Sequence, residues 1–235
     1  MKNIFVLILL IVFSFQFCAD RIFDNPLDPD KKDYGYSIIS TIPTGSIVPI
    51  DMSFTGDSIW VVDQGGKIYS LNYNSGQIIR TLNYEYDVCG ISYDGYEFYI
   101  NNKNKNLITR VNSVSGSIIQ NLYLGEGRFF EMDYFNNSIY IAERNTNSIY
   151  ILDSQTAQVL SVVSNTGFSI DGVCFDGEFI WTVDSTTSKI YKISIDGSLI
   201  NQYKSPDKYP CSICYYDNTF WIGDKSGKIF RIRIK

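Results

Sequence analysis

One segment recurs five times along the chain, and each copy ends in a large aromatic residue. These five residues, here called the anchors, are separated by 39, 41, 41 and 40 residues; they are Trp60, Tyr99, Tyr140, Trp181 and Trp221. A second apolar segment follows every anchor, from Lys67-Ile-Tyr-Ser-Leu in the first copy to Lys228-Ile-Phe-Arg-Ile in the last. A period of about 40 residues indicates a repeat architecture in which each copy folds into the same unit.

Within each unit, apolar and polar residues alternate, and Asp-Gly, Asn-Asn or Ser-Gly pairs interrupt the alternation. This pattern is typical of short antiparallel strands joined by hairpins. Four such strands in a 40-residue unit are the signature of a blade of a β-propeller. The last unit lacks its fourth strand, and residues 36–42 have the pattern of that strand. We therefore predict an all-β, five-bladed propeller over residues 36–235, closed by residues 36–42.

The chain contains no histidine, and its 20 basic and 25 acidic residues give a formal net charge of −5. Without histidine there is no Ser-His or Cys-His catalytic dyad and no imidazole ligand for a metal. A nucleic-acid surface needs clustered lysine and arginine, which an acidic chain does not favour. We expect a protein, peptide or glycan partner, no nucleic acid, and a monomeric protein.

The first 17 residues read as an export signal, with a charged start and an apolar run from Ile4 to Phe13. Cys18 follows, and residues 18–35 form an acidic, proline-containing stretch. This arrangement resembles a bacterial lipoprotein, in which the cysteine after the signal carries lipid. We expect a propeller anchored to a membrane through Cys18, in the periplasm or at the cell surface, with simple secretion as the alternative.

One polar residue lies three positions after each anchor, and these five form a predicted acidic ring. They are Asp63, Asn102, Glu143, Asp184 and Asp224. The ring has two interpretations: a cation site, because hard cations take several oxygen ligands, or a set of caps, because Asp and Asn accept backbone hydrogen bonds in tight turns. We favour caps, and expect no cofactor, with calcium as the alternative for this ring.

The loops that enter the first strand of each blade differ most between copies, and binding sites break symmetry. Three of them bring aromatic and charged residues toward one end of the central channel. The candidate ligand-binding residues are Tyr84, Glu85, Tyr86, Arg128, Phe129, Glu131 and Tyr209. Such mixtures suit recognition of a peptide or a sugar, and ordinary packing around the axis is the alternative.

Four further cysteines, Cys89, Cys174, Cys211 and Cys214, lie on or just before the first strand of their blades. Cys174 and Cys214 occupy equivalent positions on neighbouring blades, so a disulfide between these blades is one interpretation in an exported protein. Buried free thiols acting as small apolar residues are the other.

The unit Phe175-Asp-Gly-Glu-Phe-Ile-Trp-Thr-Val-Asp, followed by Lys189-Ile-Tyr-Lys-Ile, resembles the repeats of a large bacterial propeller group. That group includes NHL-type repeats, streptogramin-lyase-like proteins and the five-bladed glutaminyl cyclases. Streptogramin lyase relies on histidine, which this chain lacks. The cyclases are expected to carry a catalytic Glu directly after the second-strand aromatic of an early blade, and here Val61 follows Trp60.

We therefore expect a noncatalytic extracytoplasmic binding or assembly module. The alternative is a glutaminyl-peptide cyclotransferase that uses carboxylates of the loop face, such as Glu131, Glu143 and Asp171.

Overall fold

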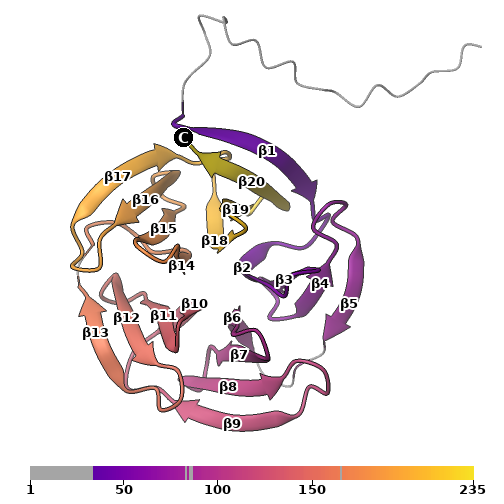
Figure 1. Ribbon diagram of the computed structural model, residues 1–235, viewed down its shortest axis with the longest axis vertical. Coiled ribbons are helices and arrows are strands. Elements are labelled where there is room, and N and C mark those ends of the chain that lie inside the picture. Colours follow the sequence, from indigo (N-terminus) through magenta and orange to yellow (C-terminus); the bar gives the residue numbers. More distant parts are fainter. Residues whose placement is uncertain (1–33, 83, 85–86, 165) are drawn as a thin grey trace, which may run out of the picture. The chain divides into compact units, whose positions relative to one another are not determined.

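Five four-stranded antiparallel sheets are arranged in a ring around a central axis (Figure 1). The computed structural model describes residues 34–82, 84, 87–164 and 166–235. Blade 1 contains β2 (Pro49–Phe54), β3 (Ile59–Asp63), β4 (Ile68–Leu71) and β5 (Ile78–Leu82). Blade 2 contains β6 (Val88–Tyr93), β7 (Glu97–Asn102), β8 (Leu107–Asn112) and β9 (Ile118–Tyr123). Blade 3 contains β10 (Phe129–Phe135), β11 (Ser138–Glu143), β12 (Ser148–Asp153) and β13 (Val159–Val163).

Blade 4 contains β14 (Val173–Phe175), β15 (Ile180–Asp184), β16 (Lys189–Ile193) and β17 (Leu199–Lys204). Blade 5 combines the two ends of the propeller: β18 (Pro210–Tyr216), β19 (Thr219–Asp224), β20 (Lys228–Ile234) and β1 (Tyr36–Pro43). The five-bladed all-β fold predicted from the repeat is confirmed. Cys18, the predicted site of lipid attachment, and residues 1–17, the predicted export signal, lie outside the described residues.

The outermost strand of blade 5 is β1, which pairs antiparallel with β20 from Tyr36 opposite Ile234 to Pro43 opposite Lys228. Ile42 of this strand is 1% exposed and packs in the apolar cluster between blades 5 and 1. The prediction that residues 36–42 complete the last blade is confirmed. The ring has no open end at which an unfinished blade would expose its edge.

The hairpins take the conformations that their turn residues favour. Asn136 and Asn137, at the turn between β10 and β11, both have positive φ, at 47° and 63°. Asn tolerates this left-handed region better than most residues, and two successive positive φ angles suit a tight hairpin. In the turn between β12 and β13, Ala157 has φ 57°, where the equivalent residues of blades 1, 2 and 4 are glycines. Ala157 therefore sits in a region that its Cβ disfavours.

The apolar core consists of five clusters, and each lies between two neighbouring blades. The anchors occupy these clusters and are between 0% and 6% exposed. Aromatic rings at the ends of the innermost strands stack on anchors of the adjacent blade; Phe175 lies 4.6 Å from Tyr140 between ring centroids. Burying one large apolar side chain stabilises a fold by roughly 1.5–3 kcal/mol. The blades are therefore held together mainly by the anchors and their partners.

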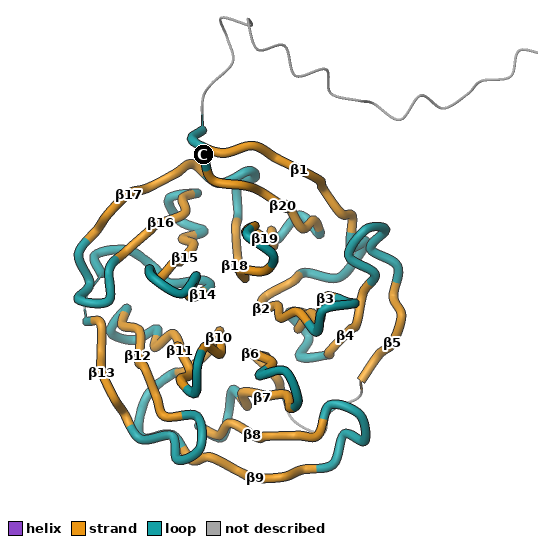
Figure 2. Tube along the Cα trace, viewed as in Figure 1, coloured by secondary structure: helices purple, strands orange, loops and turns teal. Residues whose placement is uncertain are grey.

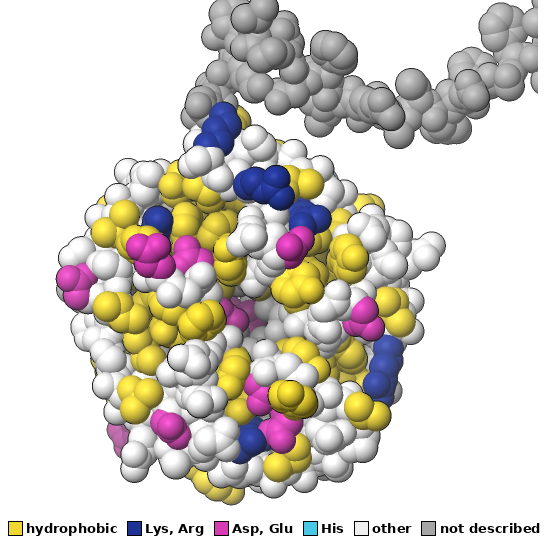
Figure 3. Space-filling model, viewed as in Figure 1, with side chains coloured by type: hydrophobic (Ala, Val, Ile, Leu, Met, Phe, Trp, Pro, Cys, Tyr) yellow, Lys and Arg dark blue, Asp and Glu magenta, His cyan; other side chains and the backbone are white. Residues whose placement is uncertain are grey.

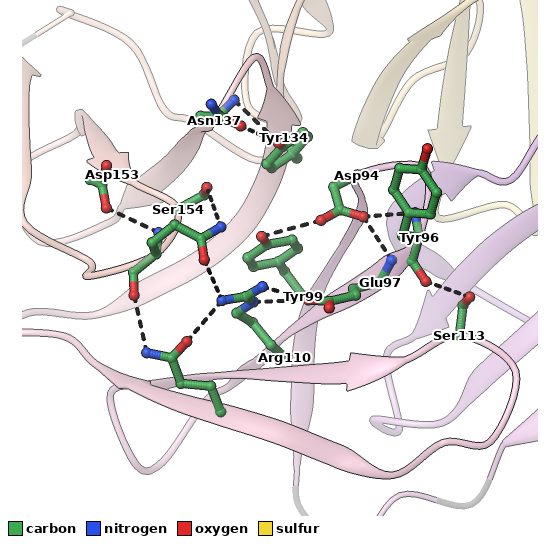
Figure 4. Close-up of polar contacts among 12 residues, drawn as sticks. Asp94, Tyr96, Glu97, Tyr99, Arg110, Ser113, Tyr134, Asn137, Asp153 and Ser154 are labelled. Carbon is green, nitrogen blue, oxygen red and sulfur yellow. Dashed lines mark hydrogen bonds and ion pairs between the residues drawn. The ribbon is translucent and has the colours of Figure 1, made fainter.

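A polar contact also joins blades 2 and 3 at the rim. The guanidinium of Arg110 donates to Glu97 at 2.7 Å, to Gln120 at 2.8 Å and to Gln155 of the next blade at 2.6 Å (Figure 4). The side chain of Gln120 in turn donates to the backbone carbonyl of Gln155 at 3.0 Å. The hydrogen bonds from Arg110 to Glu97 are partly buried, whereas those to Gln120 and Gln155 are exposed to water. The contact with Gln155 joins the turn of blade 3 to blade 2.

Loops and turns join consecutive strands around the ring (Figure 2). Because neighbouring strands of a blade run in opposite directions, successive loops lie on opposite faces of the ring. The entry face carries the loops that lead into the innermost strands and the turns between the second and third strands of each blade. On the face shown in Figure 3, hydrophobic side chains gather in patches around a central hollow in which acidic atoms are visible. No helix able to cross a membrane is found among the described residues.

Candidate functional site

A cavity of about 430 Å³ opens at the axis on the entry face. In four of the five blades, the pairing between the innermost strand and the second strand shifts in register near the start of the innermost strand. The shifts lie next to Ile50, Cys89, Phe130 and Cys211. These four residues line the cavity. A bulge in a strand redirects a side chain, and bulges are frequent next to functional sites. The irregular start of the innermost strands thus supplies part of the cavity wall.

Three basic side chains line the cavity, and they occupy equivalent positions on three blades. Lys103, Arg144 and Lys225 each follow directly after a residue of the acidic ring, and Gln64 holds the same position on blade 1. Each residue of the acidic ring lies at the start of the turn between the second and third strands of its blade. The residue that follows it in the sequence therefore lies at the cavity. The repeat therefore brings three cations together although they are far apart in the sequence.

Carboxylates line the same cavity. Asp171 accepts a hydrogen bond from the backbone N–H of Ser185 at 2.8 Å, and Asp87 accepts one from the side chain of Asn104 at 2.7 Å. Glu131 forms an ion pair with Arg144, and the Glu131 side chain is 1% exposed against 36% for that of Arg144. Acidic and basic groups thus share one small space, which suits a polar ligand that carries charge.

Glu131 is a cavity carboxyl group whose ionisation is strongly perturbed. Burial raises the pKa of Glu131 to about 7, although the positive charge of Arg144 acts in the opposite direction. A carboxyl group with this pKa is partly protonated near neutral pH, so it can both accept and donate a proton there. Glu131 is therefore the one cavity side chain whose shifted pKa suits acid–base chemistry.

Phe130 provides an aromatic surface among the cations. The Arg144 guanidinium lies 4.1 Å from the centre of its ring, the Arg128 guanidinium 5.5 Å and the Lys103 ammonium 6.0 Å. An aromatic face attracts a nearby cation electrostatically, most strongly at short range. The ring of Phe130 therefore helps to hold Arg144 at the cavity wall.

The acidic ring has the hydrogen bonds expected of turn caps at four of its five positions. Asp63 accepts from the backbone N–H of Lys67 at 2.8 Å, and Asp184 accepts from those of Thr186 and Thr187 at 2.7 and 3.2 Å. Asp224 accepts from the N–H groups of Tyr209 and Ser226.

Glu143 accepts four hydrogen bonds, from the N–H groups of Arg128, Asn145 and Thr146 and from the Thr146 hydroxyl. Asn102 differs, because its side-chain amide donates to the Leu107 carbonyl and the Thr109 hydroxyl. The ring thus resembles a set of caps with one exception, and cation binding there remains the untested alternative.

The candidate ligand-binding residues are dispersed. Among the candidates that the structure describes, only Glu131 lines the cavity, while the Arg128 side chain lies beside Phe130. Phe129 is 5% exposed in the cluster between blades 2 and 3, and Tyr84 packs against the cluster between blades 1 and 2.

Tyr209 is 45% exposed on the entry face, with the Lys208 ammonium 5.1 Å from its ring centre. Glu85 and Tyr86 lie outside the described residues.

Of the three carboxylates suggested for the enzymatic alternative, Glu131 and Asp171 lie at the cavity, whereas Glu143 is held as a cap. The residues directly after the anchors are Val61, Ile100, Ile141, Thr182 and Ile222, and all are at most 1% exposed. None of them bears a carboxylate, so the position that the cyclase resemblance singled out holds no acid in any blade.

The four cysteines among the described residues are free and buried, so the interpretation of Cys174 and Cys214 as a disulfide does not hold here. Burial raises the pKa of each of these thiols far above its ordinary value, with nearby carboxylates acting in the same direction. A thiol that stays protonated is a poor nucleophile. The cysteines therefore serve as small apolar side chains, including Cys89 and Cys211 in the cavity wall.

The architecture defines the chain as a five-bladed β-propeller, and comparison with solved structures agrees. A glutaminyl cyclase from Myxococcus xanthus is similar with a TM-score of 0.69 and 13% sequence identity, over 84% of this chain and 95% of that chain. A chain of a mitotic checkpoint complex is similar with a TM-score of 0.52 and 12% identity, over 78% of this chain and 60% of that chain.

No known family model and no curated protein matches the sequence. At these identities the structural likenesses establish the fold alone.

Proposed function

We propose that the protein is a noncatalytic binding module, and that its ligand places an anionic group in the axial cavity. The observation that carries this proposal is the convergence of Lys103, Arg144 and Lys225, from three blades, on one cavity. Lys103 forms no ion pair with a carboxylate of the described residues, and Lys225 contacts only a hydroxyl, that of Ser185 at 3.4 Å. Two ammonium groups are therefore available for a ligand.

The ligand class that fits is a short peptide or a glycan bearing a carboxylate. Lysine ammonium groups supply charge-assisted hydrogen bonds to carboxylate oxygens. Asp87, Asp171 and the partly ionised Glu131 add negative charge at the same cavity, which opposes the binding of a ligand with many negative charges. A single anionic group with neutral or positively charged surroundings is the better match.

We propose further that this module works outside the cytoplasm, exported by residues 1–17 and anchored through lipid on Cys18. The support is the apolar run before Cys18 and the acidic stretch after it. In a bacterial host, the full chain should partition into detergent, and its N-terminal peptide should carry the mass of a lipid. Cys18→Ser protein that still partitions into detergent would contradict this.

The binding proposal is tested by calorimetry with short peptides that differ only at the C-terminus, as free carboxylate or amide. The carboxylate peptides should bind, and the amides should bind more weakly. Lys103→Met together with Lys225→Met should abolish that preference. Lys67→Met removes an exposed lysine that does not line the cavity and serves as the matched control. Equal affinity for both peptide forms in the parent protein would exclude the proposal.

A second function has a specific observation in its favour: the fold likeness to a glutaminyl cyclase, with a carboxyl group of pKa about 7 in the cavity. In this reaction the α-amine of an N-terminal Gln attacks its side-chain amide carbon, a C–N bond forms and ammonia leaves. Glu131 would take a proton from the amine and return it to the leaving nitrogen. Incubation with such a peptide should then release ammonia, and Glu131→Gln should prevent it, whereas Asp153→Asn should not.

A further inference from the structure

Three buried oxygen atoms near the axis have no hydrogen-bond partner among the described residues. They are Oδ1 of Asp51, Oδ1 of Asn101 and Oε2 of Glu131. All three residues are 0% exposed. A buried acceptor without a partner typically costs about 1–3 kcal/mol, so three such oxygens in one part of a fold require an explanation.

The remaining polar atoms of the same side chains are firmly held. Oδ2 of Asp51 accepts hydrogen bonds from the N–H groups of Ile91 at 2.8 Å and Met132 at 3.2 Å. The Asn101 amide donates to the Phe130 carbonyl at 2.8 Å, and Oε1 of Glu131 pairs with Arg144. Each residue thus uses one atom to fix its side chain and leaves one oxygen free.

The three side chains come from β2, β7 and β10; those of Asp51 and Asn101 lie beside Gly90, and Glu131 directly follows Phe130, whose carbonyl oxygen lies there too. A Cβ atom at Gly90 would lie 2.5 Å from the Phe130 carbonyl oxygen, 3.2 Å from Cβ of Asn101 and 3.3 Å from Oδ2 of Asp51. The strands β2, β6 and β10 are the innermost strands of three consecutive blades. Glycine at position 90 therefore lets β6 and β10 approach closely beside Asp51 and Asn101. Glu131, from the same strand as Phe130, also lines the cavity.

From this arrangement we infer that a hard divalent cation, calcium, binds at the axis between Asp51, Asn101 and Glu131. Calcium takes carboxylate and amide oxygens in irregular geometry and retains water ligands, which the adjoining cavity admits. Magnesium fits less well, because it demands near-octahedral geometry and gives up water reluctantly.

The composition of the site favours such an ion. A divalent cation between the carboxyl groups of Asp51 and Glu131 would give a partner to the free oxygen of each. No group of three or more Cys, Asp and Glu side chains suited to a metal occurs among the described residues. This site differs in composition, since its third oxygen comes from an amide.

The test uses the full chain, freed of metal with a chelator, and measures thermal unfolding and binding heat with calcium chloride. Magnesium chloride and potassium chloride at matched ionic strength control for screening. Calcium should bind with measurable heat and raise the melting temperature, because a ligand that binds only the folded state stabilises it. Magnesium should have less effect, and potassium none beyond that of ionic strength.

Variants locate the ion. Asp51→Asn should abolish the calcium-dependent rise. Asn101→Asp adds a third carboxylate, so it should lower stability without calcium and enlarge the rise with calcium. Asp184→Asn alters the acidic ring and should leave the rise unchanged.

No rise in both the parent protein and Asn101→Asp would overturn the inference and leave protons shared between the carboxyl groups as the explanation. A rise that is lost in Asp184→Asn, or retained in Asp51→Asn, would place the ion elsewhere and equally overturn it. If Asp51→Asn does not fold, the comparison of Asn101→Asp with the parent protein decides.

Discussion

Replacing Glu143 with alanine is expected to be the most destabilising single substitution in the acidic ring. Its carboxylate accepts hydrogen bonds at 2.8 Å from Arg128, 3.1 Å from Asn145, and 2.9 and 2.6 Å from the N–H and hydroxyl of Thr146. Hydrogen bonds to a charged group contribute about 1.5–3 kcal/mol each in mutational series, and bonds that share one acceptor are not additive. We expect a loss of about 3 kcal/mol for Glu143→Ala.

The same reasoning gives a smaller effect at Asp63, which is only partly buried and accepts one hydrogen bond in its turn. Asp63→Ala should cost about 1 kcal/mol. For a domain of this size, 1 kcal/mol corresponds to a shift of roughly 2–4 °C in melting temperature. Glu143→Ala should therefore melt about 6–12 °C below the parent protein, and Asp63→Ala about 2–4 °C below it.

The pH dependence provides an independent check. Burial alone raises the pKa of Glu143, but its hydrogen bonds from Thr146 and from backbone N–H groups outweigh burial and hold this pKa below the ordinary value of 4.5. Its contribution to stability is therefore complete above pH 4.5 and is lost as the pH falls through the folded-state pKa. Urea unfolding of the parent protein and of Glu143→Gln should converge in free energy as the pH is lowered below 4.5. Equal losses at Glu143 and Asp63, or curves that stay parallel, would refute this account.

One truncation and two further substitutions have defined outcomes. A chain that starts at Thr44 lacks β1 and with it the burial of Tyr36 and Ile42, so its free energy of unfolding should fall by at least about 3 kcal/mol. Urea unfolding identical to that of the full chain would contradict ring closure. With a pKa of about 7 for Glu131, the folded state binds more protons than the unfolded chain between pH 4.5 and 7, so its stability declines as the pH rises through that window. Glu131→Gln should make this decline less steep. An unchanged slope of stability against pH would argue against the raised pKa. Ala157→Gly should raise the melting temperature, because glycine adopts φ 57° without the strain that a Cβ imposes; a lower melting temperature would show that the turn carries no strain.

The repeat made the fold predictable. Evenly spaced anchors and turn residues are local signals, and each copy of the repeat contains them. A weak pattern in one blade is therefore supported by the patterns of the other four. Closure by β1 was predictable for the same reason, since one copy of the fourth strand was missing at the end and present at the start. The five copies of the repeat predicted the number of blades.

The cavity was harder to predict, because its residues follow no repeated type. Each of the three cations, Lys103, Arg144 and Lys225, directly follows a residue of the acidic ring in the sequence. Blades 1 and 4 have Gln64 and Ser185 at that position. A comparison of copies at that position would have found three cations aimed at one axis. Asp51 and Gly90 gave no such signal, because their roles depend on contacts across three blades and not on any pattern within one.

The pairing of β1 with β20 sets the timing of assembly. The strand that closes the ring is the first part of the propeller to leave the ribosome, and its partner, residues 228–234, is the last. At roughly 5–20 residues per second, β1 waits about 10–40 s for that partner to be made. During this interval Ile38, Ile39 and Ile42 have no sheet to join, and such a strand is prone to pair with a neighbouring chain. For this molecule, the speed of synthesis and the concentration of nascent chains decide how much of it closes on itself.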